Sequence, residues 1–277
     1  MSRIVAIAGH LNRFMIPKFV LQRLEDVNKG IAALLPEPAK APLRLVRLWL
    51  KTLPYYGTGR HCPVCGKASN RFRPDWNTQA QEAICIHCGA RERHRFVWLY
   101  FNRWTDLFNG QPKCVLHVAP EPCFEPRMRK LLGEGYITSD LTNPLAMSRM
   151  DITSIDYPDG TFDVIYCSHV LEHVPEDRRA MKEFYRVLKK GGWAILLVPI
   201  SGETTLEDLS IVDPLERLRL YGEKDHVRCY GLDFMDRLKD AGFLVTLTRV
   251  SDVVNRDEVT LMGLTQESGD IFYCTKQ

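Results

Sequence analysis

From Gln111 onward, short apolar runs alternate with stretches whose apolar residues recur at helical spacing. We expect strands at residues 113–118, 136–139, 162–167, 193–199, 243–250 and 271–274. We expect helices at 175–190, with Gly191 and Gly192 as its stop, and at 233–241. Strands that alternate with helices are typical of βαβ units, so this pattern predicts an α/β fold with a parallel sheet.

The amino-terminal part of the chain has a different pattern. Apolar residues recur at helical spacing over 4–14, and the Pro-rich run at 34–38 ends that pattern. A second stretch at 43–53 mixes basic with apolar residues before Pro54. It could lie on a membrane surface or on a partner, although packing against the protein itself is favoured. We therefore expect residues 1–58 to form a helical N-terminal region.

Composition and charge narrow the class of protein. The chain of 277 residues is 45% hydrophobic, 10% aromatic and 26% charged, which excludes disordered, collagen-like and coiled-coil proteins. Its apolar runs are far shorter than the roughly 18 residues of a transmembrane helix, so we expect no membrane span. The net charge of +3 divides into +10 over the first 109 residues and −7 over the rest. A basic module could face nucleic acid, a phosphorylated substrate or a membrane, or it is only a solvated basic face.

Four of the nine cysteines form two Cys-x-x-Cys pairs separated by 19 residues. The predicted zinc ligands are Cys62, Cys65, Cys85 and Cys88, and His61 and His87 beside them could replace a ligand. This spacing is typical of four thiolates around one tetrahedral zinc, which leaves no open position for a substrate and indicates a structural site. We expect a zinc module with a linking helix at 59–110. The other cysteines are scattered, so we expect no disulfide framework and a cytoplasmic location.

The segment after the second cysteine pair combines arginines with aromatic residues. A basic turn at 91–95 leads directly into the aromatic run at 96–101. Such a combination could hold phosphates or bases. We favour the other interpretation, in which the aromatic residues are core and the arginines are solvated or cap the helix.

The sequences YPDGTFDVIYCSHVLEHV at 157–174 and RVLKKGGW at 186–193 closely resemble the class I S-adenosylmethionine-dependent methyltransferases of the small-molecule type. The resemblance covers roughly residues 112–277, and we expect a methyltransferase domain at 111–277. It implies a seven-stranded, doubly wound, Rossmann-like sheet whose last strand is antiparallel. The cofactor S-adenosylmethionine would lie across the carboxyl ends of the first four strands, as ligands do in open α/β sheets.

The same resemblance implies a set of cofactor contacts. Asp140 would accept hydrogen bonds from both ribose hydroxyls, and Asp151 would accept one from the adenine amino group. Met150 and Ile152 would flank the adenine ring. The predicted cofactor-binding residues are His117, Ala119, Glu121, Asp140, Leu141, Met150, Asp151, Ile152 and Ser168. Asp140 and Asp151 could instead be ordinary loop or capping residues.

One segment departs from the family pattern. The family has a glycine-rich loop after its first strand, where glycines let the backbone approach the methionine part of the cofactor. Here His117 stands in place of the acidic residue, and Ala119, Glu121 and Cys123 stand in place of the glycines. Either Glu121 supplies a carboxylate for the ammonium group of the cofactor, or cofactor binding has been lost. We favour the first interpretation, because the other cofactor-side elements are present.

Methyl transfer to a hydroxyl or an ammonium group also needs a base. The predicted catalytic residues are His226, oriented by Asp225, and as a second choice His169; His173 is the weakest candidate. His226 could equally be a structural hydrogen-bonding residue. Ser168 and His169 end the fourth strand and would line the methyl-transfer site.

The sequence therefore predicts a methyltransferase that acts on an oxygen or nitrogen of a small molecule such as a sugar, a glycan or a secondary metabolite. A nucleic-acid methyltransferase is the alternative, with the zinc module gripping RNA or DNA. The strand end Cys-Ser-His-Val at 167–170 lacks the Asn/Asp-Pro-Pro-aromatic run of base-methylating enzymes, which favours the small molecule. A non-catalytic scaffold is the third possibility, and the oligomeric state stays open.

Overall fold

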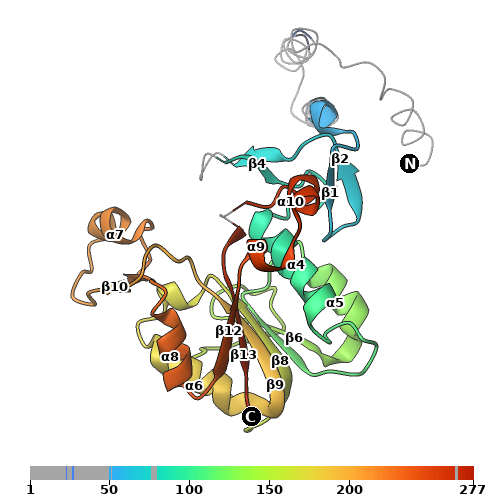
Figure 1. Cartoon of the computed structure of the whole chain (residues 1–277). Coiled ribbons are helices and arrows are strands. Elements are labelled where there is room, and N and C mark those ends of the chain that lie inside the picture. Colours follow the sequence, from blue (N-terminus) through green and yellow to red (C-terminus); the bar gives the residue numbers. More distant parts are fainter. Residues whose placement is uncertain (1–22, 24–26, 28–49, 51, 76–79, 266–267) are drawn as a thin grey trace, which may run out of the picture. The chain divides into compact units, whose positions relative to one another are not determined.

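The computed structural model describes residues 23, 27, 50, 52–75, 80–265 and 268–277 (Figure 1). The helices expected at 4–14 and over most of 43–53 lie outside this part of the chain. The chain divides into two compact units, one comprising residues up to Glu92 together with Thr260–Gly263, and the other comprising Arg93–Val259 with Leu264–Gln277. The expected domain boundaries at 58 and 110 stay predictions.

The described part of the first unit contains two small hairpins. β1 (Arg60–Cys62) pairs antiparallel with β2 (Lys67–Ser69), and β3 (Arg73–Asp75) pairs antiparallel with β4 (Ala80–Ile84). A short 3-10 helix, η2, at Leu53–Tyr55 precedes them. Each hairpin is too short to bury a core of its own, so another interaction must hold this unit together.

The second unit contains a seven-stranded sheet with the order β12-β13-β9-β8-β5-β6-β7. Its strands are β5 (Val115–Val118), β6 (Tyr136–Asp140), β7 (Ser148–Arg149), β8 (Phe162–Ser168), β9 (Leu188–Leu197), β12 (Leu244–Thr248) and β13 (Ile271–Thr275). β13 runs antiparallel to both of its neighbours, whereas the pairs from β9 to β7 are parallel. This order and the antiparallel last strand confirm the predicted doubly wound, Rossmann-like fold.

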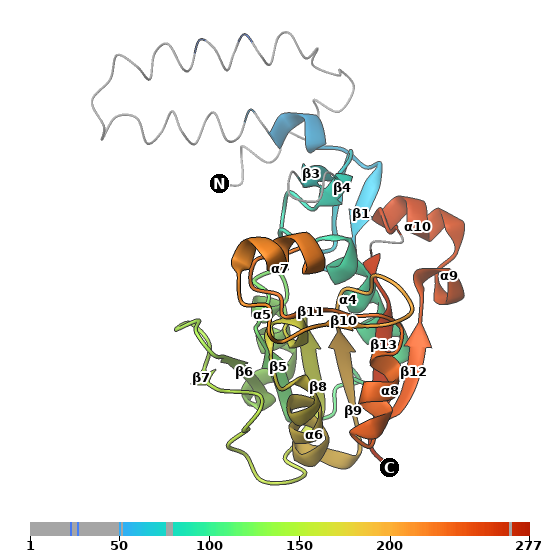
Figure 2. The ribbon, with the colours of Figure 1, turned by 90° about the vertical axis from the view of Figure 1, so that its left-hand side faces the viewer.

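Helices cover both faces of this sheet. In the described part of the chain from Glu92 onward, the helices are α4 (Glu92–Trp104), α5 (Glu125–Leu132), α6 (Asp177–Val187), α7 (Pro214–Tyr221), α8 (Phe234–Asp240), α9 (Val250–Val253) and α10 (Arg256–Met262). Figures 1 and 2 show α6 and α8 on one face and α4 and α5 on the other. In the described part of the chain, no helix is both long and apolar enough to cross a membrane.

The aromatic residues at 96–101 of α4 are buried in the core, as the favoured interpretation predicted. Phe96 and Phe101 are fully buried, and the Phe101 ring meets that of Tyr166 on β8 edge to face with 5.2 Å between centroids. The expectation of solvated arginines is wrong for Arg95, which has no exposed surface. Its long aliphatic stem allows such burial beside the aromatic residues.

The helix expected at 175–190 ends earlier. α6 ends at Val187, and Leu188 begins β9, where it pairs with Phe162 of β8. The two glycines therefore lie inside a strand and do not stop a helix. A Cβ atom on Gly192 would lie 2.8 Å from the carbonyl oxygen of Asp163, so a glycine permits the close approach of these neighbouring strands.

The segment between β9 and α8 lies beyond the carboxyl ends of the parallel strands (Figure 2). It contains α7 and the two-stranded ladder of β10 (Leu206–Glu207) and β11 (Arg228–Cys229). The amide of Val227 donates a hydrogen bond to the carbonyl oxygen of Glu172, which fastens this segment to the turn after β8. The candidate catalytic residues Asp225 and His226 belong to this segment and thus lie near the carboxyl end of the sheet.

Candidate active site and cysteine cluster

The carboxyl ends of the two central strands, β5 and β8, have an unusual backbone. Ala119 follows β5 with φ of 50° and His169 follows β8 with φ of 54°, and no other non-glycine residue in the described part of the chain has a positive φ. Side chains with a Cβ rarely adopt this conformation, and such strain concentrates at functional sites. Both residues lie at the edge where open α/β sheets bind their ligands.

His117 and Glu121 form a buried pair at the end of β5. The Nε2 atom of His117 donates a hydrogen bond to Oε2 of Glu121 at 2.6 Å, and the Tyr166 hydroxyl donates one to Oε1 at 3.0 Å. Nδ1 of His117 lies 2.6 Å from the Tyr136 hydroxyl. Burial alone would raise the pKa of Glu121, but the hydrogen bond and the charge of His117 outweigh it and lower this pKa to about 2. Glu121 is thus an ionised carboxylate whose two oxygens both have protein partners.

This pair predicts a pH-dependent stability. The carboxylate of Glu121 stabilises the folded protein fully above the ordinary pKa of 4.5, and its contribution is lost as the pH falls toward about 2. A Glu121→Gln variant should therefore lose about 3 kcal/mol of unfolding free energy at neutral pH, because a pKa unit corresponds to about 1.4 kcal/mol. Urea unfolding at intervals from pH 6 to pH 2.5 should give a shallower pH dependence for this variant than for the wild type. Equal slopes would contradict the buried pair, and Glu134→Gln, at an exposed position, is the control.

Cys123 occupies the last of the predicted glycine positions. It is buried, and its Sγ atom lies 3.4 Å from Nδ1 of His94. Burial and the nearby charge of Glu121 raise the pKa of this thiol to about 12. The thiol is therefore protonated at neutral pH and inert.

Asp140 and Asp151 are the two aspartates that the sequence predicts as cofactor contacts, and they lie at the end of β6 and shortly after β7. Oδ1 of Asp140 accepts hydrogen bonds from the amides of Thr142 and Asn143, both at 2.7 Å. Oδ1 of Asp151 accepts from the amide and the hydroxyl of Thr153, both at 2.8 Å, and these bonds lower the pKa of Asp151. Both residues cap turns, as the alternative interpretation expected, but each uses only one oxygen. Their Oδ2 atoms stay available to a ligand.

The remaining predicted cofactor residues differ in exposure. Met150, Ile152 and Ser168 are buried with 7%, 5% and 7% of their surface exposed, whereas Leu141 is 53% exposed. Met150 and Ile152 belong to the same apolar core cluster. The side chains on either side of Asp151 therefore pack into the protein core, and their contact with a cofactor stays a prediction.

A cluster of histidines surrounds a buried carboxylate after β8. Glu172 lies in the 3-10 helix η4 (Leu171–His173), is 1% exposed, and has its Oε1 3.3 Å from Nδ1 of His169. The rings of His173 and His226 meet edge to face with 4.7 Å between centroids. The structure thus brings together the histidines that the sequence singled out separately.

The expected orientation of His226 by Asp225 does not form in the described part of the chain. Oδ2 of Asp225 lies 3.3 Å from Nδ1 of His173, whereas Nδ1 of His226 is held by the carbonyl oxygen of Tyr221 at 3.1 Å. The sequence reasoning also gave no role to Glu172. The spacing of His169, Glu172 and His173 over a single turn was the signal that could have indicated it.

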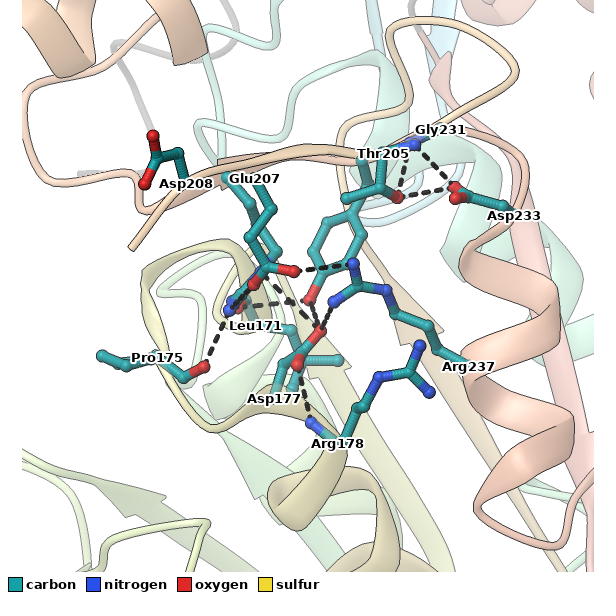
Figure 3. A network of polar contacts seen from close by, with 12 residues as sticks. Leu171, Pro175, Asp177, Arg178, Thr205, Glu207, Asp208, Gly231, Asp233 and Arg237 are labelled. Carbon is teal, nitrogen blue, oxygen red and sulfur yellow. Dashed lines mark hydrogen bonds and ion pairs between the residues drawn. The ribbon is translucent and has the colours of Figure 1, made fainter. Parts of the chain in front are cut away.

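Figure 3 shows the polar network around Asp177, Glu207 and Arg237. A fully buried arginine, Arg228, joins this network to the turn after β8. Arg228 donates hydrogen bonds to the carbonyl oxygens of Leu171, Val174 and Pro175 and to the carboxylate of Glu207. Partial burial would raise the pKa of Glu207, but hydrogen bonds from Arg237 and Arg228 outweigh it and lower that pKa.

The network extends to the first residue of α6. The carboxylate of Asp177 accepts hydrogen bonds from the Tyr230 hydroxyl at 2.6 Å and from Arg237 at 2.8 Å. Nothing in the sequence distinguishes Arg228 from exposed arginines, because its burial depends on the segments that the fold brings together.

The four predicted zinc ligands converge in the first unit. Cys62 ends β1 and Cys65 lies in the turn between β1 and β2, whereas Cys85 and Cys88 lie in the turn after β4. Gly66 and Gly89 follow these pairs with φ of 68° and 76°, and their amides donate to Cys62 and Cys85. The ligand atoms of all four cysteines lie within 4.8 Å of one another.

The distances between these thiols fit a metal ion. Sγ of Cys62 is 3.7 Å from that of Cys88, and Sγ of Cys65 is 3.8 Å from that of Cys85. Four sulfurs at the zinc–sulfur distance of about 2.3 Å form a tetrahedron whose edges measure about 3.8 Å. The neighbouring His87 places Nε2 3.1 Å from the carbonyl oxygen of Ala68, outside this cluster.

Residues 123–196 match the protein family described as "Methyltransferase domain". Over 75 residues the chain is 36% identical to the uncharacterized methyltransferase YcgJ of Bacillus subtilis (strain 168), an overlap of 27% of this chain and 28% of that protein. Over 51 residues it is 35% identical to phosphatidylethanolamine N-methyltransferase of Cereibacter sphaeroides, an overlap of 18% of this chain and 25% of the relative. The chain thus spans less than a third of the length of these curated relatives.

Two solved structures overlap with the chain over a longer stretch. The crystal structure of YcgJ from Bacillus subtilis covers 62% of this chain and 96% of its own at 16% identity, with a TM-score of 0.40. An S-adenosylmethionine-dependent methyltransferase from Mesorhizobium loti covers 64% of this chain and 96% of its own at 12% identity, with a TM-score of 0.45. Both overlaps leave about a third of this chain unmatched.

Proposed function

We propose that the chain is a class I S-adenosylmethionine-dependent methyltransferase that methylates an oxygen or nitrogen of a small molecule. Residues 123–196 match a methyltransferase family, and this match supports the proposal. The observation that carries this proposal is that the matched segment builds the cofactor edge of the sheet. It includes β6, β8 and most of β9, at whose carboxyl ends lie Asp140 and His169. The relatives that share this segment bear the names of methyltransferases.

Asp140 and Asp151 would hold the adenosine part of the cofactor. S-Adenosylmethionine supplies an electrophilic methyl group on a sulfonium when it is bound. The free Oδ2 of Asp140 would accept from ribose hydroxyls, and that of Asp151 from the adenine amino group. Glu121 contributes negative charge near the end of β5, although His117 and Tyr166 already occupy its oxygens. The fit to the cofactor therefore rests on the two aspartates and not on a glycine-rich loop.

His169 and His226 are the candidate bases for the acceptor's proton. The acceptor atom would lose its proton to a ring nitrogen of one of these histidines when it takes the methyl group that the cofactor supplies. His169 is about a third exposed at the end of β8, next to Ser168. The Nε2 atom of His226 keeps its lone pair, because Nδ1 must carry the proton that the Tyr221 carbonyl accepts.

A nucleic-acid substrate has less support. The basic turn before the aromatic run would have to present its arginines to a phosphate backbone. Arg95 is fully buried instead, and Arg91 forms an ion pair with Asp75. The small-molecule acceptor is therefore the function we propose.

Replacement of Asp140 should weaken cofactor binding. Asn keeps the size of the side chain but removes the charge that strengthens the ribose hydrogen bonds, so Asp140→Asn should lower the affinity for S-adenosylhomocysteine by about 10- to 100-fold. Isothermal titration calorimetry of the full chain measures this affinity. Asp156→Asn, at an exposed position in the same stretch of chain, is the matched control and should bind as the wild type does. Equal affinities for all three proteins would place the cofactor elsewhere.

We also propose that the four cysteines hold a structural zinc ion. The sulfur–sulfur distances of 3.7 and 3.8 Å fit a tetrahedral tetrathiolate site. With four protein ligands the ion has no open position for a substrate. Its role would be to close two hairpins that have no core of their own.

A further inference from the structure

Glu172 is a buried carboxylate without a hydrogen bond. Its side chain is 1% exposed, and neither oxygen accepts a hydrogen bond. Nδ1 of His169 lies 3.3 Å from Oε1, but its geometry is not that of a hydrogen bond. A buried carboxylate is costly unless it is paired or coordinates a metal, so this group points to a missing cation.

Two imidazoles face the same space. One ligand atom each of Glu172, His173 and His226 lies within 4.8 Å of the others. The Tyr221 carbonyl can only accept, so Nδ1 of His226 carries its proton and Nε2 offers a lone pair. This is the arrangement of a metal-binding histidine whose second nitrogen is held by a backbone carbonyl.

His173 is oriented in a similar way. Oδ2 of Asp225 lies 3.3 Å from Nδ1 of His173, which leaves Nε2 for a metal. Asp225 is 72% exposed and His173 is 33% exposed, so solvent reaches the cluster on this side. An ion could therefore enter from this side, and ligand positions there would stay open.

We propose that Glu172, His173 and His226 bind a divalent first-row transition metal. Two imidazoles and one carboxylate are a ligand set for such ions, and three protein ligands leave positions for an oxygen or nitrogen donor of a second molecule. Bonds of about 2.1 Å place ligand atoms at most about 4.2 Å apart, so the side chains draw together slightly when the ion binds. The nitrogen and oxygen donors distinguish this site from the four-cysteine cluster.

The site does not depend on methyl transfer. It lies after β8, however, where the proposed acceptor would bind, so under the proposed function the ion would hold a donor atom of the acceptor. His173 and His226 would then be ligands, and His169 would be the base. Metal binding and cofactor binding can be measured separately, which keeps the two proposals distinguishable.

The test is a titration of the zinc-loaded full chain with Mn²⁺ alone, followed by electron paramagnetic resonance of the free ion, and with Co²⁺ alone, followed by its absorption. We expect one additional ion per chain. Glu172→Gln and His173→Gln should each weaken this binding at least 10-fold, since each variant removes a ligand. Glu176→Gln, which changes an exposed glutamate four residues away, should bind as the wild type does.

Each outcome decides the proposal. If neither Mn²⁺ nor Co²⁺ binds beyond the zinc already present, or if both ligand variants bind like the wild type, the proposal is wrong and Glu172 is only the partner of His169. Circular dichroism shows whether each variant is folded. His173 is partly exposed, so His173→Gln should fold even if Glu172→Gln, at a buried position, does not. S-Adenosylhomocysteine titrated into the same samples separates the outcomes: metal binding without cofactor binding would contradict the proposed function alone.

Discussion

A Cys85→Ser variant should lose both its zinc and the fold of the first unit. Structural zinc contributes about 10–16 kcal/mol in small zinc-binding peptides at neutral pH, and a serine hydroxyl does not replace the thiolate. The hairpins β1–β2 and β3–β4 have only two strands each, which is too few for independent stability. Nothing else in the described part of this unit offsets a loss of that size.

Zinc content by mass spectrometry and limited proteolysis over residues 60–90 measure this effect. The wild type should hold one ion at this cluster and resist cleavage, whereas the variant should hold none and be cut rapidly. Cys229→Ser changes a half-buried cysteine outside the cluster and should behave as the wild type. A Cys85→Ser variant that keeps one equivalent of zinc and stays protected would rule out the four-thiolate site.

An Arg228→Met variant should be destabilised by about 3–5 kcal/mol, because several buried backbone carbonyl oxygens lose their donor and each such loss costs about 1–3 kcal/mol. Methionine fills much of the same volume, so the loss comes from polar groups and not from a cavity. The carboxylate of Glu207 would lose its hydrogen bonds from Arg228, and Arg237 would remain its partner. The carbonyl oxygens of Leu171, Val174 and Pro175 would also lose their donor.

Urea unfolding at neutral pH compares this variant with Arg178→Met. Arg178 forms an ion pair with Asp240 in which both side chains are more than half exposed, so its replacement should change the unfolding free energy by less than about 1 kcal/mol. Equal small effects for both variants would show that the Arg228 network contributes nothing beyond a surface pair.

The fold could be predicted from the sequence where apolar periodicity dominates. The central strands after Gln111 are found at their expected places because their apolar runs are buried between two layers of helices, whereas the edge strand β12 is only partly buried. The start of β9 was missed because Lys189, Lys190 and two glycines extend the strand beyond its apolar part. This part of the strand is held by backbone hydrogen bonds to Lys276, which leave no apolar pattern in the sequence.

The candidate site could be predicted only in part. Motif positions identified Asp140, Asp151 and His169, because these residues follow strands at fixed offsets. Partners that come from distant segments gave no such signal. The sequence does not show that Tyr166 would satisfy Glu121 across 45 positions, or that His226 would meet His173 across more than 50. Such contacts depend on the order of strands in the sheet and on the segment after β9.

Under the proposed function, a nucleoside cofactor binds at the carboxyl ends of β5, β6 and β8 without a glycine-rich loop. A crystal structure of the full chain grown with saturating S-adenosylhomocysteine tests it most directly. We predict electron density for the ribose at Oδ2 of Asp140 and for the adenine beside Asp151. An empty edge with Ala119 and Glu121 in the same arrangement, or a ligand bound elsewhere on the chain, would contradict the claim.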